Sequence, residues 1–409
     1  MKYDLAIIGG GPAGMMAAGR AGELGSRVVL LEKNNKLGVK LLATGGGRCN
    51  ITNLKDARGL ANSFGNNGRW LLSAFSKFGP EELIEFFASR GLKTKVEEEG
   101  RVFPKSDSAA DVQQVLAEYL KSLKIEVKLG AEVKKVVGAG DKISKLILVS
   151  GQEIIADKYL ICTGGKSYPQ TGSTGDGYQW LKQLGHKIIS PRPALAPVII
   201  KDKFIKDLEG LSFKETGISY YSDNKKVDMT VGPLIFTANS LSGPAILNMS
   251  AIVGRENLKG AQIKIDFFPN LDFSKLDQEL SKDFSSSNKA LKNGLDQLIP
   301  PRLASVLINL AGFDGRKKLN LISREERQTL TRLLKEFPLT VLGLAGYDRA
   351  MVTAGGVDLK EINPKNMRSK IIENLYLAGE VLNLNGPTGG YNLQLCWTSG
   401  YLAGDSAAK

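Results

Sequence analysis

A glycine-rich turn near the N-terminus carries the residue types that hold a phosphate group. Gly9, Gly11 and Gly14 follow an apolar, β-branched run at 3–8 and precede a run of helical character. Glycines permit a tight turn and let the backbone approach a pyrophosphate, while the free N–H groups of the helix start attract its negative charge. Glu32 ends the next apolar run, where its carboxylate can accept hydrogen bonds from ribose hydroxyls. The spacing predicts a dinucleotide site, and the acid at Glu32 favours FAD or NAD over NADP.

A second glycine-rich segment lies near the C-terminus. The run at 374–382 is predicted to be a strand, and Gly386, Gly389 and Gly390 separate it from a predicted helix at 391–408. A backbone-rich loop before a helix can stabilise an anion through its N–H groups. The same pattern is also typical of an ordinary glycine-rich helix entry, and both interpretations stay open.

The sulfur and imidazole side chains limit the chemistry further. Cys49, Cys162 and Cys396 are widely spaced, which does not indicate a disulfide framework, a zinc site or a dithiol pair. Arg48 could lower the pKa of Cys49, so this thiol is either a proton donor or redox-sensitive group, or a small residue that packs a glycine loop. His186 is the only histidine, and its position after a predicted helix favours a structural, hydrogen-bonded role.

The composition excludes several classes of protein. The chain has 409 residues, 42% of them hydrophobic and 24% charged, as is typical of a globular protein with two or three domains. No run approaches the roughly 20 apolar residues of a membrane span. No secretory leader is visible, so we expect a cytoplasmic protein with no membrane partner and no metal. The net charge of +13 fits a polyanionic partner, or is a general surface property.

The hydrophobic pattern predicts an α/β protein whose elements position these residues. Apolar periodicity predicts a helical stretch at 69–90, and residues 124–160 are predicted to form a small antiparallel meander that returns to a parallel sheet. The proline-rich residues 191–197 mark a plausible domain boundary. Beyond it the chain is predicted to be β-rich at 198–268 and then helical at 272–335.

Longer motifs carry a resemblance to a known family. They are 40–53, 163–177 and 378–394, with 351–357 upstream of the last. In order and spacing they resemble the BaiN/RdsA family of FAD-dependent oxidoreductases, glutathione-reductase-like flavoproteins with an inserted barrel and a helical region. The resemblance covers nearly the whole chain. It implies a Rossmann-like FAD-binding domain at 1–189 and 346–409, a β-rich insert at 190–271 and 336–345, and a helical subdomain at 272–335.

The resemblance also implies which residues bind FAD. The N-terminal turn would hold the pyrophosphate, Glu32 the adenosine ribose, and the Val133 backbone the adenine. The pair Gly379–Glu380 would bind the ribityl chain, and Asn392–Leu393 would lie beside the flavin pyrimidine edge. The candidate catalytic residue is Cys49. The predicted cofactor-binding residues are Gly9, Gly11, Pro12, Ala13, Gly14, Glu32, Lys33, Lys40, Thr44, Gly45, Gly46, Gly47, Arg48, Asn50, Val133, Thr163, Gly164, Gly379, Glu380, Asn392 and Leu393.

The family implies a flavin-dependent reductase with a nucleobase or small-molecule substrate. Only one dinucleotide fingerprint is present, so NAD(P)H is expected to dock transiently without a domain of its own. One branch of the family implies reduction of uridine in ribosomal RNA, with hydride transfer to C6 of uracil and a general acid at C5. Arg48 and the run Arg316, Lys317 and Lys318 are the candidates for guiding RNA. The alternatives are an amine oxidase that uses O₂, an enone reductase, or a flavin-bound interaction protein.

Overall fold

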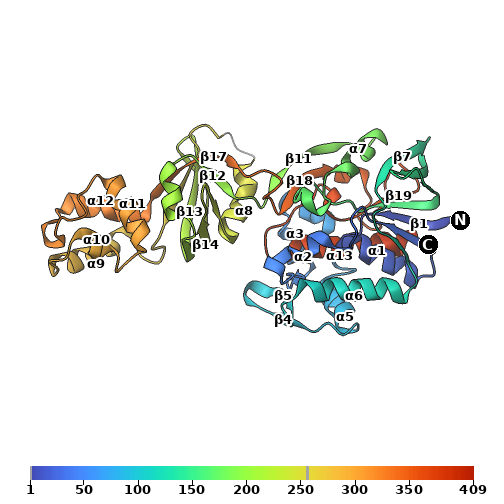
Figure 1. Ribbon diagram of the computed structural model, residues 1–409, viewed down its shortest axis with the longest axis horizontal. Coiled ribbons are helices and arrows are strands. Elements are labelled where there is room, and N and C mark those ends of the chain that lie inside the picture. The colour runs from blue at the N-terminus through green and yellow to red at the C-terminus, as the bar shows by residue number, and fades with distance from the viewer. Residues whose placement is uncertain (1, 255–257) are drawn as a thin grey trace. The chain divides into compact units, whose positions relative to one another are not determined.

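The computed structural model describes residues 2–254 and 258–409 (Figure 1). The chain forms two compact units, one from Met1–Pro193 together with Tyr347–Lys409, and one from Ala194–Gly346. Each unit has a hydrophobic core of its own. The predicted fold class, a Rossmann-like α/β protein with a barrel and a helical region, is confirmed. The division into three functional domains stays a prediction.

A five-stranded parallel sheet forms the centre of the first unit. Its strands are mainly apolar and buried, as expected for a sheet covered on both faces. The register pairs Ile8 with Leu31 on one side and with Ile161 on the other, so three strands end at the same edge. The strand order is β19 (Leu375–Leu377), β10 (Ala156–Ile161), β1 (Tyr3–Ile8), β2 (Val28–Leu31) and β6 (Glu126–Lys128).

Two helices from opposite ends of the chain pack against each other in this unit. They are α1 (Pro12–Glu23) and α13 (Tyr391–Ala407), blue and red in Figure 1. Glycines permit the contact, since a Cβ atom at Gly400 would lie 2.3 Å from the Ala13 carbonyl oxygen, and Gly404 makes a similar approach one turn later. The packing fixes the C-terminal motif next to the N-terminal turn.

The predicted helical stretch at 69–90 is interrupted. Helix α4 (Leu72–Phe75) stops before Gly79, and α5 spans Pro80–Ala88. Pro80 occupies the first turn of α5, where its missing N–H costs nothing, but it could not continue a helix from the preceding turn. The helical stretch predicted at 69–90 therefore consists of separate helical segments.

The predicted meander at 124–160 is only partly antiparallel. Strand β6 pairs in parallel with β2 and extends the main sheet, because the edge of β2 offers an open ladder. The antiparallel sheet consists of β7 (Val133–Ala139), β8 (Lys142–Leu148) and β9 (Glu153–Ile154). The other elements of the unit are α2 (Val39–Leu42), β3 (Thr52–Asn53), α3 (Ala57–Asn62), β4 (Thr94–Val96), β5 (Arg101–Pro104), α6 (Ala109–Ser122), α7 (Asp176–Gln183), β11 (Ile188–Ala194) and β18 (Val352–Val357).

The second unit is a closed six-stranded barrel followed by helices. The barrel order is β12 (Val198–Ile200), β15 (Ser240–Ser242), β14 (Lys225–Phe236), β13 (Ser212–Ser222), β16 (Gln262–Asp266) and β17 (Phe337–Leu344). Helix α8 (Pro244–Val253) lies within the stretch predicted to be β-rich. It was not predicted because the segments on either side of it have the residue pattern of strands. The predicted helical stretch contains α9 (Phe273–Ser285), α10 (Leu291–Leu295), α11 (Pro301–Ala311) and α12 (Arg324–Lys335). Within the described ranges, no helix combines the length and the apolar character that a membrane crossing requires.

Candidate functional site

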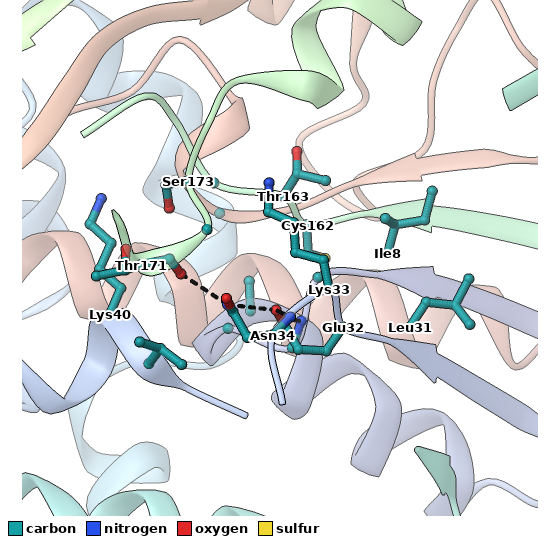
Figure 2. Close-up of a pocket in the computed structure, with 18 of the residues that line it drawn as sticks. Ile8, Leu31, Glu32, Lys33, Asn34, Lys40, Cys162, Thr163, Thr171 and Ser173 are labelled. Atoms are coloured by element: carbon teal, nitrogen blue, oxygen red, sulfur yellow. Dashed lines mark hydrogen bonds between the residues drawn. The ribbon is translucent and has the colours of Figure 1, made fainter. Parts of the chain in front are cut away.

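A cavity lies in the first unit at the carboxyl ends of β1, β2 and β10 (Figure 2). It encloses about 860 Å³ of empty space, part of it open to solvent. Ligands of open parallel sheets bind at this edge of the sheet. The predicted residues that line the cavity are Gly9, Gly11, Pro12, Ala13, Glu32, Lys33, Lys40, Val133, Thr163, Gly164, Gly379 and Glu380.

Glycine is needed in the N-terminal turn for two different physical reasons. Gly9 has a positive φ of 107°, and a Cβ at Gly14 would lie 1.9 Å from the Gly9 carbonyl oxygen, so the turn itself requires both. Gly11 has an ordinary φ of −79°, and a Cβ there would meet no atom of the chain within 4 Å. The helix start at Gly11 has no side-chain cap, which leaves its N–H groups available. The open space therefore lies where a phosphate would approach the helix.

Glu32 is a structural brace of the cavity. One carboxylate oxygen accepts from the Gly10 N–H at 2.7 Å, and the other accepts from the backbone and side-chain nitrogens of Asn34, each at 2.8 Å. Asn34 in turn donates to the Thr171 carbonyl at 3.0 Å, as the dashed lines in Figure 2 show. A carboxylate offers about four acceptor positions, so capacity remains for one ribose hydroxyl. Asn34 and Thr171 were not predicted, because their roles depend on contacts distant in sequence.

The hydroxyl of Thr163 is shielded from the cavity and lies beside Gly177, where an added Cβ would be 2.2 Å from its Oγ1. Its Oγ1 is buried and makes no hydrogen bond within the part of the chain that the structure describes. An unpaired buried hydroxyl is costly unless something else satisfies it. Thr163 lines the cavity, but its buried hydroxyl is not exposed to a group bound there.

Glu380 and Lys40 connect motifs from the two ends of the chain. Lys40 Nζ lies 2.8 Å from Glu380 Oε2, and the Thr353 N–H donates to Glu380 Oε1 at 2.8 Å. Thr353 Oγ1 also accepts from the backbone N–H of Lys166 at 2.8 Å. Glu380, predicted to bind a ribityl chain, thus has protein partners at both oxygens. Lys33 is similarly engaged, since it donates to Asp176 at 2.9 Å.

The loop at 44–50 and the C-terminal loop contact each other outside the cavity lining. Thr44–Gly47 forms a tight turn in which Gly45 and Gly46 have positive φ angles of 58° and 67°. The Asn50 amide, oriented to donate to Thr52 and Val102 carbonyls, accepts from the Gly390 N–H at 3.1 Å. Of the predicted residues, Gly14, Thr44, Gly45, Gly46, Gly47, Arg48, Cys49, Asn50, Asn392 and Leu393 are not part of the cavity lining.

The polar side chains near the C-terminal loop form hydrogen bonds mainly to the backbone of that loop. Asn392 accepts from the Gly386 N–H at 2.8 Å and donates to the Gly386 carbonyl at 2.9 Å. Asn53 donates to the Gly389 carbonyl at 3.2 Å, but its Oδ1 is buried and has no hydrogen-bond partner among the residues described. Asn53 was not among the predicted site residues, because its burial depends on contacts with segments distant in sequence.

The predicted effect of Arg48 on Cys49 is wrong. Arg48 donates to Asp107 at 2.7 Å and pairs with Glu97, and the hydrogen bond from Arg48 lowers the pKa of the Glu97 carboxyl. Cys49 is fully buried with a positive φ of 62°, and burial raises the pKa of its thiol to about 12. The thiol therefore keeps its proton at neutral pH. Cys396, which lines the cavity, has its pKa raised to about 12 by burial as well.

His186 is a buried structural side chain, as predicted. Its Nδ1 lies 2.9 Å from Glu361 Oε2 and its Nε2 lies 3.1 Å from Ser369 Oγ. Ser369 Oγ also accepts from the Ile371 and Ile372 N–H groups, so it serves a local turn. Burial lowers the pKa of His186 despite the carboxylate of Glu361. The arrangement resembles a hydrolytic triad in connectivity, but Ser369 is only 6% exposed and offers no access to a substrate.

Comparisons with known proteins find matches over nearly the whole chain. Residues 3–406 match the family described as HI0933-like protein Rossmann domain. The chain is 31% identical over 413 residues to the 3-dehydro-bile acid delta(4,6)-reductase of Clostridium scindens, with 99% of each chain covered. It is equally 31% identical over 413 residues to the ribosomal RNA dihydrouridine synthase of Haemophilus influenzae, with 98% of each covered. The superposition on the solved structure of 3-ketosteroid delta1-dehydrogenase from Sterolibacterium denitrificans covers 100% of this chain and 99% of that chain. Its TM-score is 0.56 and the sequence identity is 13%, so the similarity is one of fold alone.

Proposed function

The chain belongs to the HI0933-like family of FAD-binding oxidoreductases, and we propose that it reduces a carbon–carbon double bond conjugated to a carbonyl group. The family membership confirms the resemblance that the motifs predicted. The observation that carries the proposal is shared chemistry between relatives with different substrates. A delta(4,6)-reductase of a 3-dehydro-bile acid and a dihydrouridine synthase both saturate a double bond in conjugation with a carbonyl.

The cavity of the first unit fits FAD. Gly11 leaves open space against an uncapped helix start, and Glu32 lines the same cavity with its carboxylate. We propose that α1 and Gly11 hold the diphosphate, that Glu32 accepts from the ribose, and that the turn at Thr163 and Gly164 lies against the bound group. Bound FAD would supply the hydride for the reduction, after NADH or NADPH had reduced it.

Ribosomal RNA is the substrate we propose, with uridine as the reacting nucleoside. The uracil ring contains a double bond conjugated to its C4 carbonyl, and a net charge of +13 favours a polyanion over a steroid that carries a single carboxylate. Addition of a hydride at one carbon and a proton at the other completes the reduction and converts NAD(P)H to NAD(P)⁺. The second candidate is a conjugated 3-oxo steroid acid, which the relative from Clostridium scindens favours.

Anaerobic flavin titration tests the proposal. The FAD-loaded protein is reduced with NADH or NADPH, and the return of the oxidised flavin spectrum is followed after addition of an unmodified ribosomal RNA transcript. We expect the transcript to restore the oxidised spectrum and to gain dihydrouridine, detected by mass spectrometry of nucleosides. A 3-oxo-4,6-diene bile acid and O₂ are the parallel oxidants.

The outcomes separate the candidates. Reoxidation by the bile acid but not by RNA would replace the substrate while keeping the reaction type. Flavin that NAD(P)H does not reduce, but an amine does, with rapid reoxidation by O₂, would contradict the reductase proposal. The variant Gly11→Val, which is expected not to bind FAD, is the control for reactions independent of the cofactor.

A further inference from the structure

A groove lies on the outer surface of the barrel in the second unit. It contains about 970 Å³ of empty space, including open solvent, between strands β13, β14 and β16 and the helices α9 and α12. No residue of the cofactor cavity contributes to it. It is therefore a separate site with a chemistry of its own.

The strand register explains the shape of the groove. Ser219 of β13 pairs with Met229 of β14 on one side and with Lys264 of β16 on the other. Two residues further along the same face of β13, Gly217 lies opposite Asp266. The middle strand thus presents small side chains at Gly217 and Ser219 and the Tyr221 ring at one end, while longer side chains extend from both neighbouring strands. The groove is therefore deepest over Gly217 and Ser219 and is bordered by the longer side chains of β14 and β16.

The charges of the groove do not cancel. Its carboxylates each have a lysine partner, Asp266 with Lys335 at 2.6 Å and Glu336 with Lys264 at 2.9 Å. Arg332 also lines the groove, is exposed, and has no side-chain hydrogen bond or ion pair within residues 2–254 and 258–409.

A second cation of the groove also has no acidic partner. Lys226 contacts the Met229 sulfur at 3.1 Å and makes no ion pair in the described part of the chain. Together, Lys226 and Arg332 give the groove two positive charges that no carboxylate of the lining neutralises. Such a site attracts a ligand that carries more than one negative charge.

Apolar surfaces stand next to these cations. Met229 is 54% exposed and Phe273 is 40% exposed. The Tyr221 ring also lines the groove, with Lys264 Nζ 4.9 Å from its centre. Flat or soft apolar faces between uncompensated cations are typical of sites that stack bases and hold the phosphates of single strands. An acidic peptide would use the cations but not the exposed ring.

We propose that this groove binds a single-stranded segment of RNA, with Arg332 and Lys226 on phosphates and Phe273 and Met229 against bases. The proposal rests on the proposed function, because it supplies a docking surface for an RNA substrate. It differs from the sequence prediction, which named Arg48, Arg316, Lys317 and Lys318.

Of the residues named from the sequence, Lys318 is exposed but lies outside the groove, and the other three are less available than the groove cations. Arg316 pairs with Asp314 at 3.1 Å, and Lys317 pairs with Glu326 at 2.6 Å. Arg48 pairs with Asp107 at 2.6 Å. A phosphate would have to displace these carboxylates. No such displacement is needed at Arg332.

The test measures binding of a fluorescent single-stranded oligouridylate to the FAD-loaded protein at several salt concentrations. The variant Lys226→Ala/Arg332→Ala removes the two uncompensated cations. The matched control Arg316→Ala/Lys318→Ala removes two exposed cations of the same unit outside the groove. We expect the groove variant to bind at least tenfold more weakly and to lose about 1.4 from the salt slope, at about 0.7 per phosphate contact.

A stacking variant and a competing ligand complete the test. Phe273→Ala should weaken binding by about fivefold or more with little change in the salt slope, because it removes a stacked base and no phosphate contact. The control variant should change affinity by less than twofold. A poly-aspartate peptide that competes as well as the oligonucleotide would overturn the assignment to RNA.

Parallel measurements separate this proposal from the proposed function. Equal affinities of the groove variant and the control would overturn the groove while wild-type reduction of ribosomal RNA could still stand. Absence of any oligonucleotide binding by a wild-type protein that reduces ribosomal RNA would also overturn the groove alone. Failure of wild-type protein to reduce ribosomal RNA, with normal flavin reduction by NAD(P)H, would overturn the substrate and not the cofactor.

Discussion

The two glycine-rich segments look alike in sequence, but their glycines have different neighbours in the structure. A Cβ atom at Gly11 would meet nothing within 4 Å, whereas one at Gly390 would lie 2.4 Å from the Thr52 carbonyl. The N-terminal turn leaves space for a group outside the chain, and the C-terminal loop fills its space with the chain itself. A glycine pattern therefore predicts a close approach without saying whether a ligand or the backbone makes it.

The largest effect is expected for Gly14→Ala, because the backbone of the turn already occupies the space of its Cβ. Helix propensity alone would favour alanine by about 1 kcal/mol. The 1.9 Å approach to the Gly9 carbonyl reverses that sign, and we expect the free energy of unfolding to fall by more than about 4 kcal/mol. Thermal denaturation measures it, with Gly11→Ala as the matched control. Unchanged stability of Gly14→Ala would mean that the turn is not as tight as described.

Gly11→Val sharpens the comparison in the opposite direction. The backbone of Gly11 is ordinary and its Cβ direction is open, so we expect the apo protein to change its free energy of unfolding by less than about 1 kcal/mol. The side chain would occupy the space of the diphosphate, so FAD content should fall by at least about 100-fold, a loss of roughly 3 kcal/mol in binding. Released flavin fluorescence after denaturation gives the content. Full FAD content in Gly11→Val would assign the open space to something else.

Local patterns were sufficient for the N-terminal half of the site. The strand, the turn, α1, the second strand and Glu32 are neighbours in sequence, so their local pattern is sufficient to predict each of them. The interruption at Gly79 and Pro80 was readable in principle, because proline begins helices and does not continue them. The parallel pairing of β6 was not, since it depends on which strand edge remains open after the rest of the sheet has formed.

Contacts between distant segments account for what the sequence analysis missed at the site. Thr353 binds Glu380, and Asn34 binds Thr171, across separations that no periodicity records. The same reason explains the error at Cys49. Arg48 is adjacent in sequence, but its guanidinium pairs with Asp107 instead, and burial dominates the pKa of the thiol.

An intermediate effect is expected from Lys40→Met, which tests whether Glu380 belongs to the cavity or to the packing. The pair is partly buried, with the side chains 22% and 16% exposed, so removal of Lys40 leaves a carboxylate without its cation. We expect the apo protein to lose about 1–3 kcal/mol of stability. The double variant Lys40→Met/Glu380→Gln should recover most of that loss.

The FAD affinity of the same variants then locates the role of Glu380. If its carboxylate binds the cofactor, the double variant should be stable and still bind FAD at least about tenfold more weakly, a difference of roughly 1.4 kcal/mol. Recovery of both stability and FAD affinity in the double variant would reduce Glu380 to an ion-pair partner. Isothermal titration of apo protein with FAD provides the measurement.

The smallest effect concerns Cys49, which is fully buried. Its folded pKa of about 12 lies above the ordinary value of 9.0, so the neutral thiol is the form that the native state favours. The associated stability is therefore complete below about pH 9 and is lost as the pH rises toward 12. We expect the stability of wild type to fall more steeply with pH above about 9 than that of Cys49→Ala, by at most about 1.4 kcal/mol per pH unit. Both are compared in a Cys162→Ala/Cys396→Ala background, because those thiols titrate in the same direction. Parallel curves would contradict the burial of Cys49, and a loss of turnover larger than the loss of FAD content would instead assign it the proton of the reduction.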